Sequence, residues 1–172
     1  MCIRDSADGF GRMRGTPAAT LTHLGPGLGN GLANLHNAKK ARTPVVNVIG
    51  DHATFHRQYD APLSSDVAGI AAPVSGWLKV SESADDVARD GAEAVQASMS
   101  PPGQVASLIL PADTAWNRTE AQAKPLPKIS AQPVDPAGVE RAAAALHSGK
   151  PAVILMNGVL TLSLIHISEP TR

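Results

Sequence analysis

Apolar residues along the chain alternate between short continuous runs and stretches in which they recur every three or four positions. Short apolar or β-branched runs bounded by glycine and proline are typical of buried strands, and the longer spacing is typical of helices. The runs predict strands over residues 18–24, 44–49, 77–80 and 104–110. Helical patterns occupy residues 7–14, 26–37, 65–72 and 83–99. This alternation indicates an α/β fold, with a parallel sheet covered by helices on both faces.

Local signals mark the ends and the buried sides of these helices. Gly15 is suited to a helix C-terminus, and Pro26 fits a first helical position, where its missing N–H costs nothing. Ser83-Ala84-Asp85-Asp86 predicts a capping box, with Asp86 in the place of the usual glutamate. The apolar positions expected to face the core are Leu28, Leu32 and Leu35 in the second helix and Val87, Gly91, Ala94 and Val95 in the last.

The composition changes at Trp116, which divides the chain into domains. Residues 117–134 are rich in Pro, Lys, Gln and Ala without a hydrophobic period, as is typical of an interdomain linker. We therefore expect one domain over residues 7–118 and a linker over residues 119–134. The start of a second α/β domain is expected over residues 135–160, where Asp135-Pro136 begins a helix and Pro151 to Met156 forms a strand.

The two ends of the chain lack the signals that start or close a domain. We interpret residues 1–6 and 161–172 as appendages foreign to the natural protein, with a natural tail as the alternative. On this interpretation the first domain lacks its first part and the second domain is truncated.

Composition and charge narrow the classes of function. Fifteen basic residues balance fifteen acidic ones, which gives no electrostatic case for binding nucleic acid or an anionic membrane. No apolar run approaches the roughly 20 residues that span a bilayer, and no signal peptide pattern precedes the first helix. The single cysteine, Cys2, excludes a disulfide framework and a thiolate metal cluster. We expect a cytoplasmic protein without nucleic-acid or membrane partners.

The best candidate for a site is the stretch from Leu21 to Asn30, where a predicted strand passes through a glycine-proline turn into a helix. Ligands of open α/β sheets bind at the carboxyl ends of the strands, so His23 and the turn after it lie at the expected place. A dinucleotide-binding turn is one alternative, although Asn30 stands where the third glycine of G-x-G-x-x-G belongs and Pro26 removes a donor. A turn that only allows close packing of strand and helix is another.

His52 and His56 follow the strand predicted over residues 44–49 and are candidate metal ligands. They are four residues apart and flanked by acids, but no convincing third ligand accompanies them. A histidine in a loop at a strand end is better suited to donating a proton or a hydrogen bond to a substrate. We expect no metal ligands in this chain.

Three blocks of residues, Ala7 to Gly15, Gly25 to Asn30 and Pro44 to Gly50, together resemble the N-terminal, pyrimidine-binding domain of thiamine-diphosphate-dependent enzymes. The family pattern reads A-D-G-[YF]-A-R-x-x-G, a strand, G-P-G-x-x-N, a helix and P-x-x-x-I-x-G. The resemblance covers about residues 7–118. It is greatest to acetolactate synthase large subunits, with benzoylformate decarboxylase-like enzymes next, and residues 135–160 look like the start of that family's central domain.

The resemblance implies roles for particular residues. Pro26 and Asn30 match residues that line the pocket for the aminopyrimidine ring, and Gly25 and Gly27 shape the turn. His23 falls where benzoylformate decarboxylase-like members carry an active-site histidine, whereas acetolactate synthases usually carry a small polar residue. Asp51-His52 stands where acetolactate synthases usually carry a glutamine, and we assign His52 with His23 to the catalytic residues.

The implied reaction is decarboxylation of a 2-oxo acid on thiamine diphosphate, followed by transfer of the remaining fragment to an acceptor, as in acetolactate synthases. The alternatives are a benzoylformate decarboxylase-like reaction without transfer, and an α/β binding module without catalysis. Mg²⁺ and the diphosphate would be bound by a C-terminal domain outside this chain, and FAD is a further candidate cofactor because some acetolactate synthases carry it.

The resemblance also implies what this chain would need from elsewhere. The family's activating glutamate precedes the first block, at a position that the foreign leader would have replaced. The cofactor pocket of the family lies between two subunits, so the intact protein is expected to be a homodimer or homotetramer. The chain alone is therefore expected to be inactive.

Overall fold

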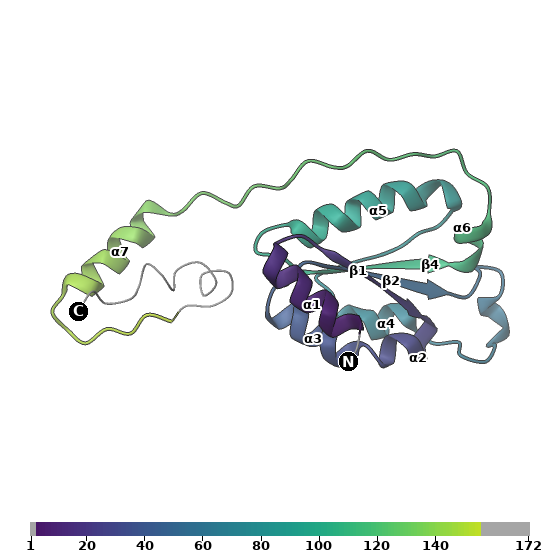
Figure 1. The fold of residues 1–172 in the computed structure, drawn as a ribbon, viewed down its shortest axis with the longest axis horizontal. Coiled ribbons are helices and arrows are strands. Elements are labelled where there is room, and N and C mark those ends of the chain that lie inside the picture. The colour runs from purple at the N-terminus through teal and green to yellow at the C-terminus, as the bar shows by residue number, and fades with distance from the viewer. Residues whose placement is uncertain (1–2, 156–172) are drawn as a thin grey trace. The chain divides into compact units, whose positions relative to one another are not determined.

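The computed structural model describes residues 3–155, which divide into one unit up to Ser130 and a second from Ala131 onward (Figure 1). None of the helices in this range is long and apolar enough to cross a membrane. The strands are β1 (Ala18–His23), β2 (Val45–Asp51), β3 (Trp77–Val80) and β4 (Val105–Pro111). The helices are α1 (Ile3–Arg14), α2 (Leu24–Gly29), α3 (Leu32–Lys40), α4 (Val67–Ala71), α5 (Ala84–Met99), α6 (Ala112–Trp116) and α7 (Pro136–His147), with 3₁₀ turns η1 (Arg57–Tyr59) and η2 (Ala72–Val74).

The four strands of the first unit form one parallel sheet in the order β1-β2-β4-β3. Because every pair is parallel, the carboxyl ends of the strands lie at one edge of the sheet. The register places His23 beside Gly50 and Asp51 beside Pro111 at that edge. The predicted parallel α/β sheet is confirmed.

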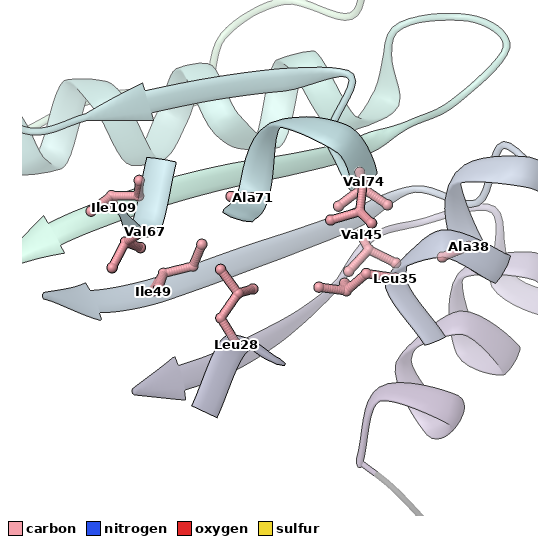
Figure 2. Packing of buried hydrophobic residues seen from close by; sticks show 10 residues of the cluster. Leu28, Leu35, Ala38, Val45, Ile49, Val67, Ala71, Val74 and Ile109 are labelled. Atoms are coloured by element: carbon pink, nitrogen blue, oxygen red, sulfur yellow. The ribbon is translucent and has the colours of Figure 1, made fainter. Parts of the chain in front are cut away.

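The larger core lies between one face of the sheet and helices α2, α3 and α4 (Figure 2). Leu28 and Leu35, which are 0% and 1% exposed, pack there with Val45, Ile49 and Ile109 of the central strands. The leucines that recur at helical spacing thus face the core, as the sequence predicts.

Helix α5 covers the opposite face of the sheet, where the second core is built from Val46, Ala94, Ala106 and Leu108. Ala94 is buried as predicted, but Val95 is 47% exposed, so its assignment to the core is wrong. The buried side of α5 instead follows Asp90, Ala94 and Ser98, at a spacing of four residues. A carboxylate lies on this side because Ser81 and Lys79 satisfy it.

The strand and helix around the glycine turn are confirmed with two changes. β1 ends at His23, one residue earlier than predicted, because Leu24 has a φ of 53° and starts the helix. Pro26 is then the third helical residue, still within the first turn, where N–H groups have no intrahelical partner. The expected single helix is interrupted after Gly29, since glycine is a poor helix former and three glycines follow Pro26 within five residues.

The capping box predicted at residues 83–86 forms differently. Ser83 is the N-cap of α5, but its hydroxyl donates to the carboxylate of Asp86 at 2.6 Å and caps no backbone N–H. Aspartate has one methylene fewer than glutamate, so its carboxylate stays close to the serine hydroxyl and does not reach back to the Ser83 backbone.

The second unit contains α7, whose predicted start at Asp135-Pro136 is confirmed. The Asp135 carboxylate accepts hydrogen bonds from the backbone N–H groups of Ala137 and Gly138, at 3.1 and 3.0 Å.

The strand predicted from Pro151 to Met156 is wrong over residues 151–155. These residues form no strand, because no other strand lies within residues 131–155 to pair with them. Met156 and the expected tail at residues 161–172 lie outside the described residues, whereas residues 3–6 of the expected leader are part of α1.

Candidate functional site

The candidate site lies at the carboxyl edge of the sheet, where β1, β2 and β4 end side by side. β1 ends at His23, β2 at Asp51, and β4 runs directly into α6 at Ala112. The loop after β2 and the helix after β4 are therefore placed next to each other by the parallel register.

A strained residue sets the direction of the chain after His23. Leu24 is a non-glycine residue in the left-handed region, which costs about 1–3 kcal/mol. Its side chain is only 3% exposed, so burial in the core offsets this cost and holds the bend in place. Gly50 on the neighbouring strand lies beside the His23 ring, since a Cβ there would make an ordinary van der Waals contact with His23 Nδ1 at 3.7 Å.

The glycines and the proline of the turn differ in their surroundings. Gly25 is buried, and a Cβ at this position would lie 2.1 Å from Ser65 Oγ. The absence of a side chain at Gly25 therefore allows the backbone to pack closely against Ser65. A Cβ at Gly27 would make only ordinary contacts, and Gly29 faces open space. Pro26 in α2 and Asn30, the residue directly after α2, are exposed. Their assignment to a cofactor pocket stays a prediction.

Hydrogen bonds fix the loop after β2. The Asp51 carboxylate accepts from the His52 backbone N–H at 2.8 Å and from the Arg57 guanidinium at 2.7 Å. Asp113 of α6 accepts from both the backbone N–H and the hydroxyl of Thr54, at 2.9 and 2.5 Å. These hydrogen bonds from Thr54 hold the pKa of Asp113 below its ordinary value of 3.8. The loop is thus tied at one end to β2 and in its middle to α6.

The two histidines of this loop stack on each other. The rings of His52 and His56 lie 5.4 Å apart at 25°, and Tyr59 meets His56 edge-on at 5.9 Å. His52 Nε2 is buried and has no hydrogen-bond partner among the described residues. Over the same part of the chain, no three His, Cys, Asp or Glu side chains gather as a metal site would require.

A hollow of about 270 Å³ opens between these elements. It brings together His23 and His52, the two histidines that the sequence assigns to catalysis, although their catalytic role stays a prediction. Gly25, Pro26, Gly27 and Asn30 are not among the residues that line it. The lining residues are His23, Leu24, Asp51, His52, Ala53, Phe55, His56, Ala112 and Trp116.

Three residues of this region were not predicted from the sequence to take part in the site. Phe55 and Trp116 line the hollow, and Asp113 anchors its loop, but none of them belongs to a recognisable motif. The rule that ligands bind at strand carboxyl ends, applied to the strand that ends at Pro111, is the signal that points to Asp113 and Trp116.

Comparison of the sequence with known proteins gives one family and several relatives. Residues 6–70 match the thiamine pyrophosphate enzyme, N-terminal TPP binding domain. The chain is 52% identical over 157 residues to IlvX of Mycobacterium tuberculosis, which carries the name of an acetolactate synthase large subunit; the match covers 91% of this chain and 30% of IlvX. It is 33% identical over 144 residues to benzoylformate decarboxylase of Pseudomonas aeruginosa, covering 83% of this chain and 24% of that enzyme.

Comparison of the structure with solved structures gives the same fold. Benzoylformate decarboxylase from Polynucleobacter necessarius matches with a TM-score of 0.77 at 24% identity, covering 86% of this chain and 28% of that one. The thiamine diphosphate-dependent 4-hydroxybenzoylformate decarboxylase of Rhodococcus jostii RHA1 matches with a TM-score of 0.69 at 24% identity, covering 85% and 28%. The chain thus spans about 30% or less of the length of each of these relatives.

Proposed function

The chain belongs to the thiamine pyrophosphate enzymes, and we propose that it supplies the pyrimidine-binding part of an enzyme that acts on 2-oxo acids. The observation that carries this proposal is the meeting of His23 and His52 in one hollow beside the glycine-proline turn. Two imidazole groups at the carboxyl edge of a parallel sheet are suited to binding and protonating a small substrate.

We assign the aminopyrimidine ring of the cofactor to the surface of α2. Gly27 and Gly29 present backbone without side chains. A Cβ built at either position would clash with no neighbouring atom, so the surface over both residues is open. Pro26 in this short helix and Asn30 directly after it are exposed and would hold the ring, with the Asn30 amide as a hydrogen-bonding group. When bound, thiamine diphosphate supplies the electron sink for loss of carbon dioxide from a 2-oxo acid.

The residues of the hollow would then act on the substrate. His23, exposed at the end of β1, would hold or deliver a proton beside the cofactor ring, and His52 would orient the substrate from the neighbouring strand end. Transfer to an acceptor, as in acetolactate synthases, is the proposed outcome because the relative at 52% identity carries that name. Protonation without transfer, as in benzoylformate decarboxylases, is the second candidate, since the resemblance places a histidine at position 23 in those enzymes.

The proposed enzyme needs parts beyond this chain. We propose that Mg²⁺ and the diphosphate are held by another domain, that two or four copies assemble to complete the pocket, and that FAD is a candidate only in the presence of the full central domain. The chain of 172 residues alone should then release no carbon dioxide from pyruvate in the presence of thiamine diphosphate and Mg²⁺.

The test compares two histidine variants of the full-length enzyme that carries these residues. His23→Ala should lower the turnover number by about 100-fold, the lower range for loss of a general acid or base, and should change the Kd for thiamine diphosphate less than about twofold. His36→Ala, an exposed histidine on α3, is the matched control and should change neither.

Turnover is measured as carbon dioxide release, and the Kd by isothermal titration calorimetry with Mg²⁺ present. An equal loss of turnover and cofactor affinity in His23→Ala would contradict the role given to His23. Absence of thiamine diphosphate binding by the unmodified enzyme would contradict the proposed function as a whole.

A further inference from the structure

Helix α5 has an apolar side that the core of the sheet does not use. Its buried side follows Asp90, Ala94 and Ser98, whereas Val95 is 47% exposed. Apolar residues on the side of Val95 recur every three or four positions and line a groove; they are Ala88, Gly91, Ala92, Val95 and Met99. An apolar helix side left outside the core is typical of a surface that contacts another molecule.

The second wall of the groove is the chain over residues 123–128, which follows α6 and runs along α5 (Figure 1). The Gln96 amide donates to the Pro127 carbonyl at 2.8 Å. Ahead of this wall, the Thr119 hydroxyl donates to the Asp85 carboxylate at 2.6 Å. Two prolines within the wall fix their own φ angles. A wall that is already held in place loses little conformational entropy when a ligand binds.

The groove is long, and its floor is open. Its volume of about 500 Å³ lies within the range of about 300–1,000 Å³ that is usual for ligand sites. At a rise of about 1.5 Å per residue, Ala88 and Met99 lie about 16 Å apart along α5. A Cβ built at Gly91 would have no neighbouring atom within 4 Å. A linear apolar chain matches this shape better than a compact ring does.

The charges at the groove have one sign. Among the described residues that line it, only Lys124 and Lys128 are charged. Both are exposed, and neither forms an ion pair with a carboxylate in the described part of the chain. The α5 residues of the lining carry no acid that would repel an anion. The groove therefore combines an apolar interior with two ammonium groups at its rim.

We propose that this groove is a binding site for small carboxylic acids with an unbranched aliphatic chain. The chain lies along the apolar side of α5, over Gly91 and against Val95, and the carboxylate pairs with Lys124 or Lys128. The site is separate from the hollow at the carboxyl edge of the sheet and has no lining residue in common with it.

The experiment titrates the full chain with octanoate, hexanoate and 1-octanol, and follows the carbon-13-labelled methionine methyl groups by NMR. Octanoate should shift the methyl signal of Met99, which lines the groove, and leave that of Met13, which is exposed on α1. It should bind about fivefold more tightly than hexanoate, because two further CH₂ groups are partly buried. It should also bind about fivefold more tightly than 1-octanol, which has no charge to pair with the lysines.

Two glycine variants provide a matched comparison. Gly91→Leu places a side chain on the open floor and should weaken octanoate binding at least about tenfold, since the aliphatic chain loses its place. Gly9→Leu changes a glycine of α1 that is equally free of neighbours, and should alter binding less than about twofold. Leucine favours a helix more than glycine does, so both helices are retained.

The charge is tested separately. The double variant Lys124→Gln and Lys128→Gln should bind octanoate only as tightly as 1-octanol, and should bind 1-octanol as the original chain does.

The inference would be overturned by an unmoved Met99 signal, by equal binding of octanoate and 1-octanol, or by equal weakening in the two glycine variants. A Met99 shift that grows with protein concentration in the absence of any ligand would assign the groove to a second copy of the chain, and would also overturn it. These measurements report binding to α5 alone, so their outcome is independent of whether the enzyme binds thiamine diphosphate.

Discussion

At the scale of single residues, Asp113 has the clearest effect on the candidate site. Its two carboxylate oxygens each accept one hydrogen bond from Thr54, a residue 59 positions earlier in the chain. Because these bonds favour the ionised form, the folded pKa of Asp113 is below the ordinary value of 3.8. The stabilisation is fully present above that ordinary value and is lost as the pH falls through the folded pKa.

Replacing Thr54 by Val should therefore raise the pKa of Asp113 towards 3.8, since the hydroxyl donor is removed while the shape is kept. The measurement is a carbon-13 NMR titration of the Asp113 carboxyl between pH 2 and pH 6. Thr119→Val is the control, because its hydroxyl donates to the carboxylate of Asp85. An unchanged Asp113 pKa in Thr54→Val would show that the clamp does not form.

The candidate site is only partly predictable from the sequence, for a physical reason. His23 and His52 directly follow predicted strands, so the parallel sheet alone brings them to one edge. Phe55 and Trp116 come together through the contact between Thr54 and Asp113. Such a contact between distant polar side chains leaves no trace in hydrophobic periodicity.

At the scale of elements, α5 is joined to β3 by a carboxylate in an apolar interface. Asp90 is 1% exposed and accepts hydrogen bonds from Ser81 at 2.9 Å and from Arg89, and its carboxylate lies 2.9 Å from Lys79 Nζ. Burial by itself would raise the pKa of Asp90, but hydrogen bonds from Lys79, Ser81 and Arg89 outweigh it and keep the pKa below its ordinary value. The group stays charged because its partners surround it.

Asp90→Ala should lower the free energy of unfolding by about 3 kcal/mol, because Ser81 would be left buried without its acceptor and Lys79 would lose one of its two carboxylates. Urea unfolding followed by circular dichroism measures the change. Glu93→Ala removes the more exposed partner of Lys79 and should cost less than about 1 kcal/mol. Similar losses in both variants would contradict the assignment of Asp90 as the principal contact.

The strands are the elements that the sequence predicts best. All four are short apolar or alternating runs, as burial in a sheet covered by helices requires. The position of Asp90 on the buried side of α5 was not predictable from hydropathy, because its burial depends on Lys79 of β3 and on Ser81 directly after β3. Residues 151–155 have the pattern of a strand but no partner strand among residues 131–155, and a strand needs a neighbour.

At the scale of the whole molecule, part of the predicted linker over residues 119–134 is attached to α5 and belongs to the first unit. Figure 1 shows the chain after α6 running back along α5. The Thr119 hydroxyl donates to Asp85 at 2.6 Å, and the Gln96 amide donates to the Pro127 carbonyl at 2.8 Å. Residues 123–128 and α5 together line an apolar groove of about 500 Å³. The composition, which predicts an interdomain linker, does not reveal this attachment, because single side-chain contacts hold it.

Gln96→Ala should free the end of this segment and speed tryptic cleavage after Lys128. Loss of one hydrogen bond worth about 1 kcal/mol corresponds to about a fivefold increase in the cleavage rate. Mass spectrometry of timed digests gives the rate. Gln58→Ala, which removes an amide that donates to the Phe55 carbonyl, should leave cleavage after Lys128 unchanged. Equally fast cleavage in the original chain and in Gln96→Ala would contradict the attachment.

Attachment of this segment also shortens the tether that leads to the residues after Asp135. With Pro127 bound to α5, the part of the predicted linker that is left as a tether is reduced from residues 119–134 to residues 128–134. The effective concentration of a tethered group falls with about the −3/2 power of tether length, so this shortening raises it about 3.5-fold. A single side-chain amide on α5 thus determines the length of this tether.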